Sequence, residues 1–154
     1  MVLIAHRGLI MGPDFQLENR PWQIMYALGL GFHCEVDVWY VKSKWYLGHD
    51  GPSYEVPYEF LETPNLWIHA KNLGALYVLS ANRSLNFFWH QNDDFTLTSQ
   101  GDIWTYPGKP LTRDSIMVMP EWEDATLANT VGVKCLGICS DFVLPIKNLQ
   151  NVAK

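Results

Sequence analysis

The stretch "HCEVDV" at residues 33–38 decides the fold, because its side chains divide into two chemically different faces. In an extended strand, residues i and i+2 point to the same side. His33, Glu35 and Asp37 therefore share one face, and a cysteine and two valines form the other. This pattern predicts a strand that packs its apolar side on helices and presents ionisable groups on its opposite side.

The stretch "LWIHAK" at residues 66–71 repeats this division. Trp67, His69 and Lys71 share a face opposite three apolar side chains. Buried charges are costly unless they are paired or bind a metal. Two such strands therefore favour an inward-facing site in a barrel or cleft. An open sheet with one solvated face is the alternative.

Strand-like and helix-like segments alternate along the rest of the chain. β-branched and aromatic residues predict strands at 2–6, 33–40, 44–49, 66–71, 85–90, 95–98, 102–106, 115–119 and 136–143. Helices are expected at 21–30, 72–82 and 121–129, and 54–61 is a further candidate. The alternation predicts an α/β fold with parallel strands. Segments 38–50 and 94–108 have room only for turns, so hairpins are expected there.

Composition excludes several classes of protein. With 154 residues, the chain is expected to form a single domain, 1–154. Its net charge of −5 argues against a nucleic-acid binder. No apolar run reaches the length of a membrane span and no signal peptide is evident, so a cytoplasmic protein without membrane contact is expected. Cys34, Cys135 and Cys139 lack metal-binding spacing and are expected to be free thiols.

Six short motifs follow one another along the chain. They are "HRG" (6–8), "ENRP" (18–21), "EVDV" (35–38), "GHDG" (48–51), "IHAKN" (68–72) and "GICSDF" (137–142). Together they resemble the glycerophosphodiester phosphodiesterase family of the phospholipase-C-like phosphodiesterase superfamily. The resemblance implies a TIM-like (β/α) barrel with its site at the carboxyl ends of the strands. Because such barrels need about 200 residues or more, we expect a minimal barrel with several helices reduced or missing. A homo-oligomer contact could cover the exposed strand faces.

The resemblance implies that His6 and His49 act as general acid and base. Phosphodiester cleavage takes a proton from the nucleophile and gives one to the leaving oxygen, and two imidazoles suit that exchange. A structural role for either histidine is the alternative. His33 and His90 are expected to take no part in the chemistry.

Glu35 and Asp37 match the family's metal ligands, and the third carboxylate of the family falls on His69. Oxygen ligands favour Mg²⁺ or Ca²⁺, whereas a histidine ligand shifts the preference towards Mn²⁺ or Zn²⁺. His69 could bind the metal or the substrate, or the site could have lost its metal. Salt bridges from the two carboxylates to Arg7 and Lys71 are the other interpretation.

Arg7 and Lys71 match the family's phosphate-binding cations. Glu18 could orient Arg7 or His6, or could be a simple surface carboxylate. Asn19 is expected to cap the helix that follows it.

Two later segments complete the predicted site. Trp104 and Tyr106 share a face of one predicted strand, where they could bind substrate or belong to the core. Asp141, at the end of the last strand, is expected to be structural. These assignments predict a metal-dependent phosphoric diester hydrolase that acts on a small phosphodiester. A lyase or isomerase of a phosphorylated sugar and a non-catalytic phosphate-ester-binding barrel are the alternatives.

Overall fold

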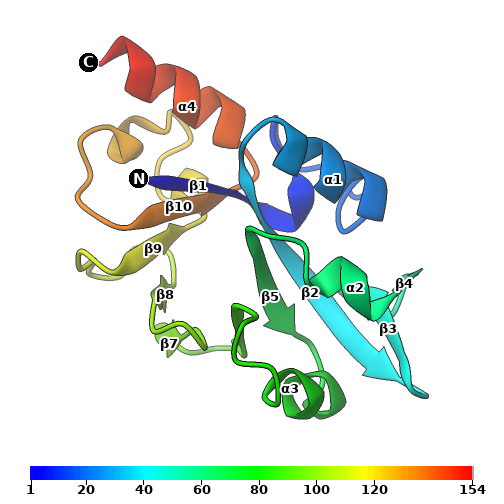
Figure 1. The fold of residues 1–154 in the computed structure, drawn as a ribbon. Coiled ribbons are helices and arrows are strands. Elements are labelled where there is room, and N and C mark those ends of the chain that lie inside the picture. Colours follow the sequence, from blue (N-terminus) through cyan, green and yellow to red (C-terminus); the bar gives the residue numbers. More distant parts are fainter. Residues whose placement is uncertain (154) are drawn as a thin grey trace.

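A single mixed sheet of ten strands forms the framework of the protein in the computed structural model, which describes residues 1–153. The sheet curls into a half-barrel, and helices lie on its outer side (Figure 1). The strands are β1 (Val2–Ala5), β2 (His33–Val41), β3 (Lys44–Leu47), β4 (Tyr54–Val56), β5 (Leu66–Ala70), β6 (Phe87–Phe88), β7 (Phe95–Leu97), β8 (Ile103–Thr105), β9 (Ser115–Val118) and β10 (Gly137–Ser140). The helices are α1 (Pro21–Gly29), α2 (Tyr58–Leu61), α3 (Leu73–Leu79) and α4 (Val143–Val152). The expected α/β class is confirmed.

Strand β1 lies between β2 and β10, and most neighbours in the sheet are parallel. On one side the order continues through β10, β9 and β8, all parallel, to β7. On the other side β2 branches. Its residues 34–38 pair in parallel with β5, and its residues 38–41 pair with β3. The carboxyl ends of β1, β2 and β5 therefore meet at one rim of the curled sheet.

The two expected hairpins are confirmed. Strands β2 and β3 pair antiparallel around Lys42 and Ser43, whose φ values are 49° and 61°. Two successive positive φ values suit the right-handed twist of a tight hairpin. Strands β7 and β8 form the second antiparallel pair.

Apolar side chains fill the inner side of the curled sheet. A buried cluster there joins residues of β1, β5, β6, β8, β9 and β10, namely Ile4, Trp67, Phe88, Trp104, Ile116, Val118, Met119 and Cys139. A second cluster on the outer side includes α1 and α3 residues that pack on β2 and β5. Packing on both faces is typical of parallel strands, and it leaves the site above the inner cluster.

The later half of the sheet has few helices. Residues 106–114 and 119–136, all of which the structure describes, connect parallel strands without an α-helix. Phe95 and Leu97 on β7 are consequently 47% and 67% exposed. The turn after β7 contacts β6 through Ser99, whose backbone N–H donates to Phe87 O at 2.8 Å. The expectation of reduced crossover helices and bare apolar strand surface is confirmed for this half.

The expected helix at 121–129 is wrong. Short 3₁₀ turns at Pro120–Trp122 and Ala128–Thr130 stand there instead. The carboxylate of Asp124 accepts hydrogen bonds from the backbone N–H and the hydroxyl of Thr126. Such local side-chain bonds compete with helix formation.

Two other segments differ from expectation. The candidate helix at 54–61 is a strand in its first part and a helix in its second, because Pro57 separates β4 from the short helix α2. Helix α4 was not among the helices expected from the sequence, and it contains Pro145. The proline lies in the first turn of α4, where its missing N–H costs no helical hydrogen bond.

The three cysteines are free, as expected, and Cys34 and Cys139 are fully buried. Among residues 1–153, no helix combines the length and apolar character that crossing a membrane requires.

Candidate functional site

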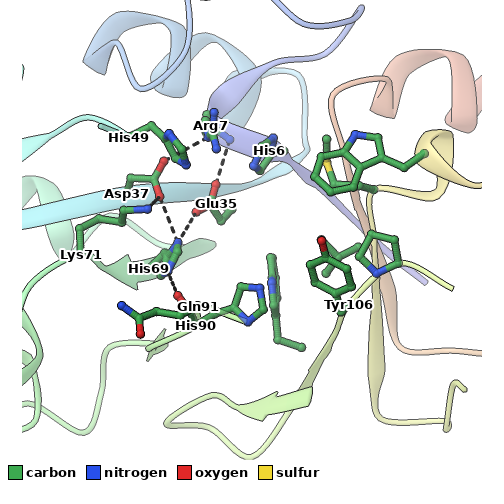
Figure 2. Close-up of a pocket in the computed structure, with 15 residues that line it drawn as sticks. His6, Arg7, Glu35, Asp37, His49, His69, Lys71, His90, Gln91 and Tyr106 are labelled. Carbon is green, nitrogen blue, oxygen red and sulfur yellow. Dashed lines mark hydrogen bonds and ion pairs between the residues drawn. The ribbon is translucent and has the colours of Figure 1, made fainter. Parts of the chain in front are cut away.

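A cavity of about 320 Å³ opens at the rim where β1, β2 and β5 end. Its lining contains every residue that the sequence assigned to the site: His6, Arg7, Glu35, Asp37, His49, His69, Lys71 and Trp104. Figure 2 shows these charged side chains gathered at one end of the cavity, with Tyr106 at the other. Side chains that the sequence places on one face of β2 and of β5 thus line the same cavity, namely Glu35, Asp37, His69 and Lys71.

Asp37 is the centre of the charged end. Its Oδ2 lies 3.1 Å from Arg7 Nε and accepts a 2.9 Å hydrogen bond from Asn19 Nδ2. Its Oδ1 lies 3.0 Å from His69 Nδ1 and 3.4 Å from Lys71 Nζ. Burial alone would raise the pKa of Asp37, but its hydrogen bond with His69 and the three positive charges lower the pKa well below its usual range. Asp37 is therefore a carboxylate at neutral pH.

Glu35 is held beside Asp37 but is ionised less readily. Its Oε2 accepts a 3.1 Å hydrogen bond from the backbone N–H of Arg7, and its Oε1 lies 3.7 Å from His69 Nδ1. Burial and the neighbouring charge of Asp37 raise the pKa of Glu35. A divalent cation between the two carboxylates would remove this repulsion.

The turn after β1 directs Arg7 towards both carboxylates. Arg7 has a φ of 52° in the short 3₁₀ turn His6–Gly8. Its Nη1 donates to Glu18 Oε2 at 2.8 Å, so of the alternatives left open for Glu18 the structure shows the contact with Arg7. The expected helix cap at Asn19 is wrong, because that amide both donates to the Asp37 carboxylate and accepts from the Asp37 backbone N–H. The helix cap position belongs to Arg20.

His69 has the hydrogen-bonding pattern of a metal ligand. Its Nε2 lies 3.0 Å from the backbone carbonyl of His90, which can only accept, so Nε2 carries a proton. Its Nδ1 faces Asp37 and Glu35, and these three side chains offer ligand atoms within 4.8 Å of one another. Nδ1 must therefore carry a second proton or a metal ion. Metal-bound histidines usually donate their other N–H to a carbonyl or carboxylate, so these residues fit a divalent cation.

The alternative of inward salt bridges is also partly present. Lys71 Nζ contacts Asp37 at 3.4 Å. Arg7 spans the pair, with its backbone N–H on Glu35 and its guanidinium near Asp37. The cations therefore balance some of the negative charge, and a bound divalent ion would share Asp37 with them.

His6 is oriented by a carboxylate that the sequence assigned only a structural role. Nδ1 of His6 donates to Asp141 Oδ1 at 2.8 Å, which leaves Nε2 for a ligand. Burial lowers the pKa of His6, but the Asp141 hydrogen bond and the charge of Glu35 outweigh that effect, so the pKa is raised. The backbone N–H of Asp141 in turn donates to Glu121.

His49 reaches the same cavity from the loop after β3. Its Nδ1 lies 2.7 Å from Asp50 Oδ1, so it too has a carboxylate partner. Figure 2 shows His49 and His6 on either side of Arg7. The cavity thus contains two histidines whose Nε2 atoms are available beside two cations.

The opposite end of the cavity is largely aromatic. Its uncharged lining residues are Trp104, Tyr106, Pro107, Val118, Met119 and Trp122. Trp104 is only 4% exposed and packs on Phe88 at 4.5 Å between ring centroids, so it forms the floor. The sequence did not point to Trp122 as a cavity residue, and it placed His90 near the site without a role in the chemistry. No periodic signal could have found Trp122, because it lies in a 3₁₀ turn.

No protein-family model, curated protein or solved structure matches this chain.

Proposed function

We propose that the protein is a metal-dependent phosphodiester hydrolase whose curled sheet is a minimal barrel of the phospholipase-C-like phosphodiesterase type. The observation that carries the proposal is the ligand set of Glu35, Asp37 and His69 beside two carboxylate-oriented histidines. Phosphodiester cleavage needs charge neutralisation and two proton transfers at one place. The cavity supplies groups for each.

Glu35, Asp37 and His69 would hold the cation, and water would complete its coordination. Two carboxylates favour Mg²⁺ or Ca²⁺, and the imidazole nitrogen makes Mn²⁺ a further candidate. A divalent ion bound there would neutralise charge on a phosphate oxygen.

Arg7 and Lys71 would bind the non-bridging oxygens of the phosphate. Both side chains are about four-fifths buried, at 17% exposure each, so their charges are weakly screened. The Nε–H of Arg7 is buried and makes no hydrogen bond among the described residues, despite lying near Asp37. Because Arg7 lines the cavity, a phosphate oxygen would have to accept from its Nη groups rather than from the buried Nε.

The two histidines would divide the proton transfers. The raised pKa of His6 makes its protonated form more populated than that of an ordinary histidine, which suits a general acid that protonates the leaving oxygen. His49 would then take the proton of the nucleophile, with Asp50 stabilising the resulting imidazolium. The nucleophile is water or a hydroxyl of the substrate.

Hydrolysis of bis(p-nitrophenyl) phosphate with Mg²⁺, Ca²⁺ or Mn²⁺ tests the proposal. We expect metal-dependent turnover that falls about 10²–10⁴-fold in His6→Ala and in His49→Ala. The matched control is His33→Ala, because His33 is a partly buried histidine outside the cavity lining. Absence of turnover with every metal would contradict the proposal, and phosphate binding without turnover would favour a non-catalytic binding barrel.

A further inference from the structure

The aromatic end of the cavity takes no part in the chemistry proposed above. The charged groups come from residues 6–71, whereas the aromatic end belongs to residues 104–122. Figure 2 shows Tyr106 facing the cavity across from His6 and the carboxylates. Since the charged end would hold the phosphate and the metal, the aromatic end is left for the organic part of a substrate.

Tyr106 and Trp122 both line the cavity and keep part of their ring surface exposed. Tyr106 is 39% exposed and Trp122 is 61% exposed. Their ring centroids lie 6.5 Å apart with an interplanar angle of 72°, an edge-to-face arrangement rather than a parallel stack. Exposed apolar surface that lines a cavity marks a ligand contact more often than it marks packing.

Polar groups lie beside these rings. Nδ1 of His90 lies 2.7 Å from Asp93 Oδ2, which leaves Nε2 for a ligand. The His90 ring is 5.9 Å from the ring of Tyr106. Gln91 also lines the cavity, and its backbone N–H donates to Asp93. Aromatic faces beside an imidazole suit a flat group with a polar atom on its edge.

We propose that Tyr106, Trp122 and His90 form a subsite for a planar aromatic ring of the substrate. This inference rests on the proposed function, because phosphate at the charged end positions the ring. The ring would be joined to the phosphate directly, as in an aryl ester, or through a sugar, as in a nucleotide. Stacking on aromatic side chains adds affinity for any planar π-system, whatever the identity of the ring.

Calorimetric titration with phosphate monoesters in the presence of Mg²⁺ tests the subsite without any turnover. The probes are inorganic phosphate, glycerol 3-phosphate, phenyl phosphate and uridine 5′-monophosphate. We expect at least one ring ester to bind about tenfold more tightly than glycerol 3-phosphate. The ring ester that binds with the higher affinity shows whether the substrate is an aryl ester, like phenyl phosphate, or a nucleotide, like uridine 5′-monophosphate.

Two further probes separate a planar ring from other occupants. Cyclohexyl phosphate is apolar but not flat, and phosphocholine offers the quaternary ammonium that aromatic rings also bind. Affinity of either probe equal to or above that of the ring esters would overturn the assignment.

A pair of tryptophan variants tests whether Trp122 is responsible for the preference for ring esters. Trp122→Ala is expected to weaken binding of the preferred ring ester about tenfold and to leave glycerol 3-phosphate unchanged. Trp22→Ala is the matched control, because Trp22 is 57% exposed on α1 and lies outside the cavity lining. Equal affinity for all phosphate esters would overturn the ring subsite alone. Failure of every phosphate compound to bind would contradict the proposed function as well.

Discussion

Nδ1 of His6 lies 2.8 Å from Oδ1 of Asp141, a residue 135 positions later in the chain. The pairing of β1 with β10 explains this contact, because Ala5 lies opposite Ser140 in the sheet. His6 and Asp141 directly follow these two residues, so they lie beside each other where the two neighbouring strands end. The contact fixes the imidazole orientation and raises the pKa of His6 against the effect of burial.

Replacing Asp141 should lower the pKa of His6. In Asp141→Asn the hydrogen-bonding shape is kept, but the charge that favours imidazolium is lost. The imidazole resonances of His6, followed by NMR against pH, should titrate at a lower pH than in the wild type. Asp93→Asn is the control, because Asp93 pairs with His90 and should leave the His6 titration unchanged. An unaltered His6 titration in Asp141→Asn would refute the electrostatic role.

The same pair should make stability depend on pH. The folded-state pKa of His6 is raised, whereas an unfolded histidine titrates near about 6.5. The contact between protonated His6 and Asp141 therefore makes its full contribution to stability at pH values below the unfolded-state pKa. This contribution is lost as the pH rises through the folded-state pKa of His6. Urea unfolding should show a larger free-energy difference between wild type and Asp141→Asn at pH 6 than at pH 9. A difference that grows with pH would contradict this sign.

Divalent metal should stabilise the protein through Glu35, Asp37 and His69. A metal at 100 times its dissociation constant adds about 2.7 kcal/mol to the free energy of unfolding, or about 5–10 °C for a chain of this size. Thermal unfolding with Mg²⁺, Ca²⁺ and Mn²⁺ measures the shift. Glu35→Gln and His69→Ala should abolish it. Glu59→Gln removes an exposed carboxylate on α2 and should keep it. An equal shift in all variants would place the metal elsewhere.

Asn19 should matter to stability through Asp37. It is 1% exposed and makes two hydrogen bonds of 2.9 Å with Asp37. Asn19→Ala leaves the buried backbone N–H of Asp37 unsatisfied and forces alanine into a left-handed conformation, with φ at 57°. We expect a loss of about 2–4 kcal/mol in urea unfolding. Asn151→Ala, at an exposed position of α4, should change stability by about 0.5 kcal/mol or less.

The buried thiols should resist alkylation. Burial, and secondarily the charge of Glu35, raise the pKa of Cys34 to about 12. Burial likewise raises the pKa of Cys139 well above its ordinary value. Iodoacetamide reacts with thiolates, so the folded protein at pH 8 should be labelled only at the partly exposed Cys135. Mass spectrometry of the labelled peptides checks this, and rapid labelling of Cys34 would show that β2 opens readily.

The charged end of the cavity could be predicted because it depends on strand periodicity. Glu35, Asp37 and His69 lie on alternating positions of β2 and β5, and the parallel register places Asp37 opposite His69. Each of the nine expected strands overlaps an observed one. Such local patterns persist in the fold because both faces of these strands are packed.

Trp104 and Tyr106 of the aromatic end were candidates from the sequence, whereas Trp122 and several connections could not be predicted, because they depend on irregular backbone. Trp122 follows Met119, whose φ of 47° ends β9 and starts a 3₁₀ turn. His90 contacts His69 through its backbone carbonyl, and a carbonyl has no sequence signature. Asp141 looked structural because the sequence does not reveal which two strand ends become neighbours.

The cavity is lined by two separate parts of the chain. One part is the branched region around β2, and the other is the helix-poor region around β8 and β9. The charged end of the cavity comes from β1, β2, β3, β5 and the residues that follow them. The aromatic end comes from β8, β9 and their connecting turns. Loops 106–114 and 119–136 could be exchanged or lengthened without altering the register that holds Glu35 and Asp37. Chimeras that keep Glu121, the partner of Asp141, and carry new loops in the rest of these two segments could thus acquire other substrate preferences with the same reaction centre.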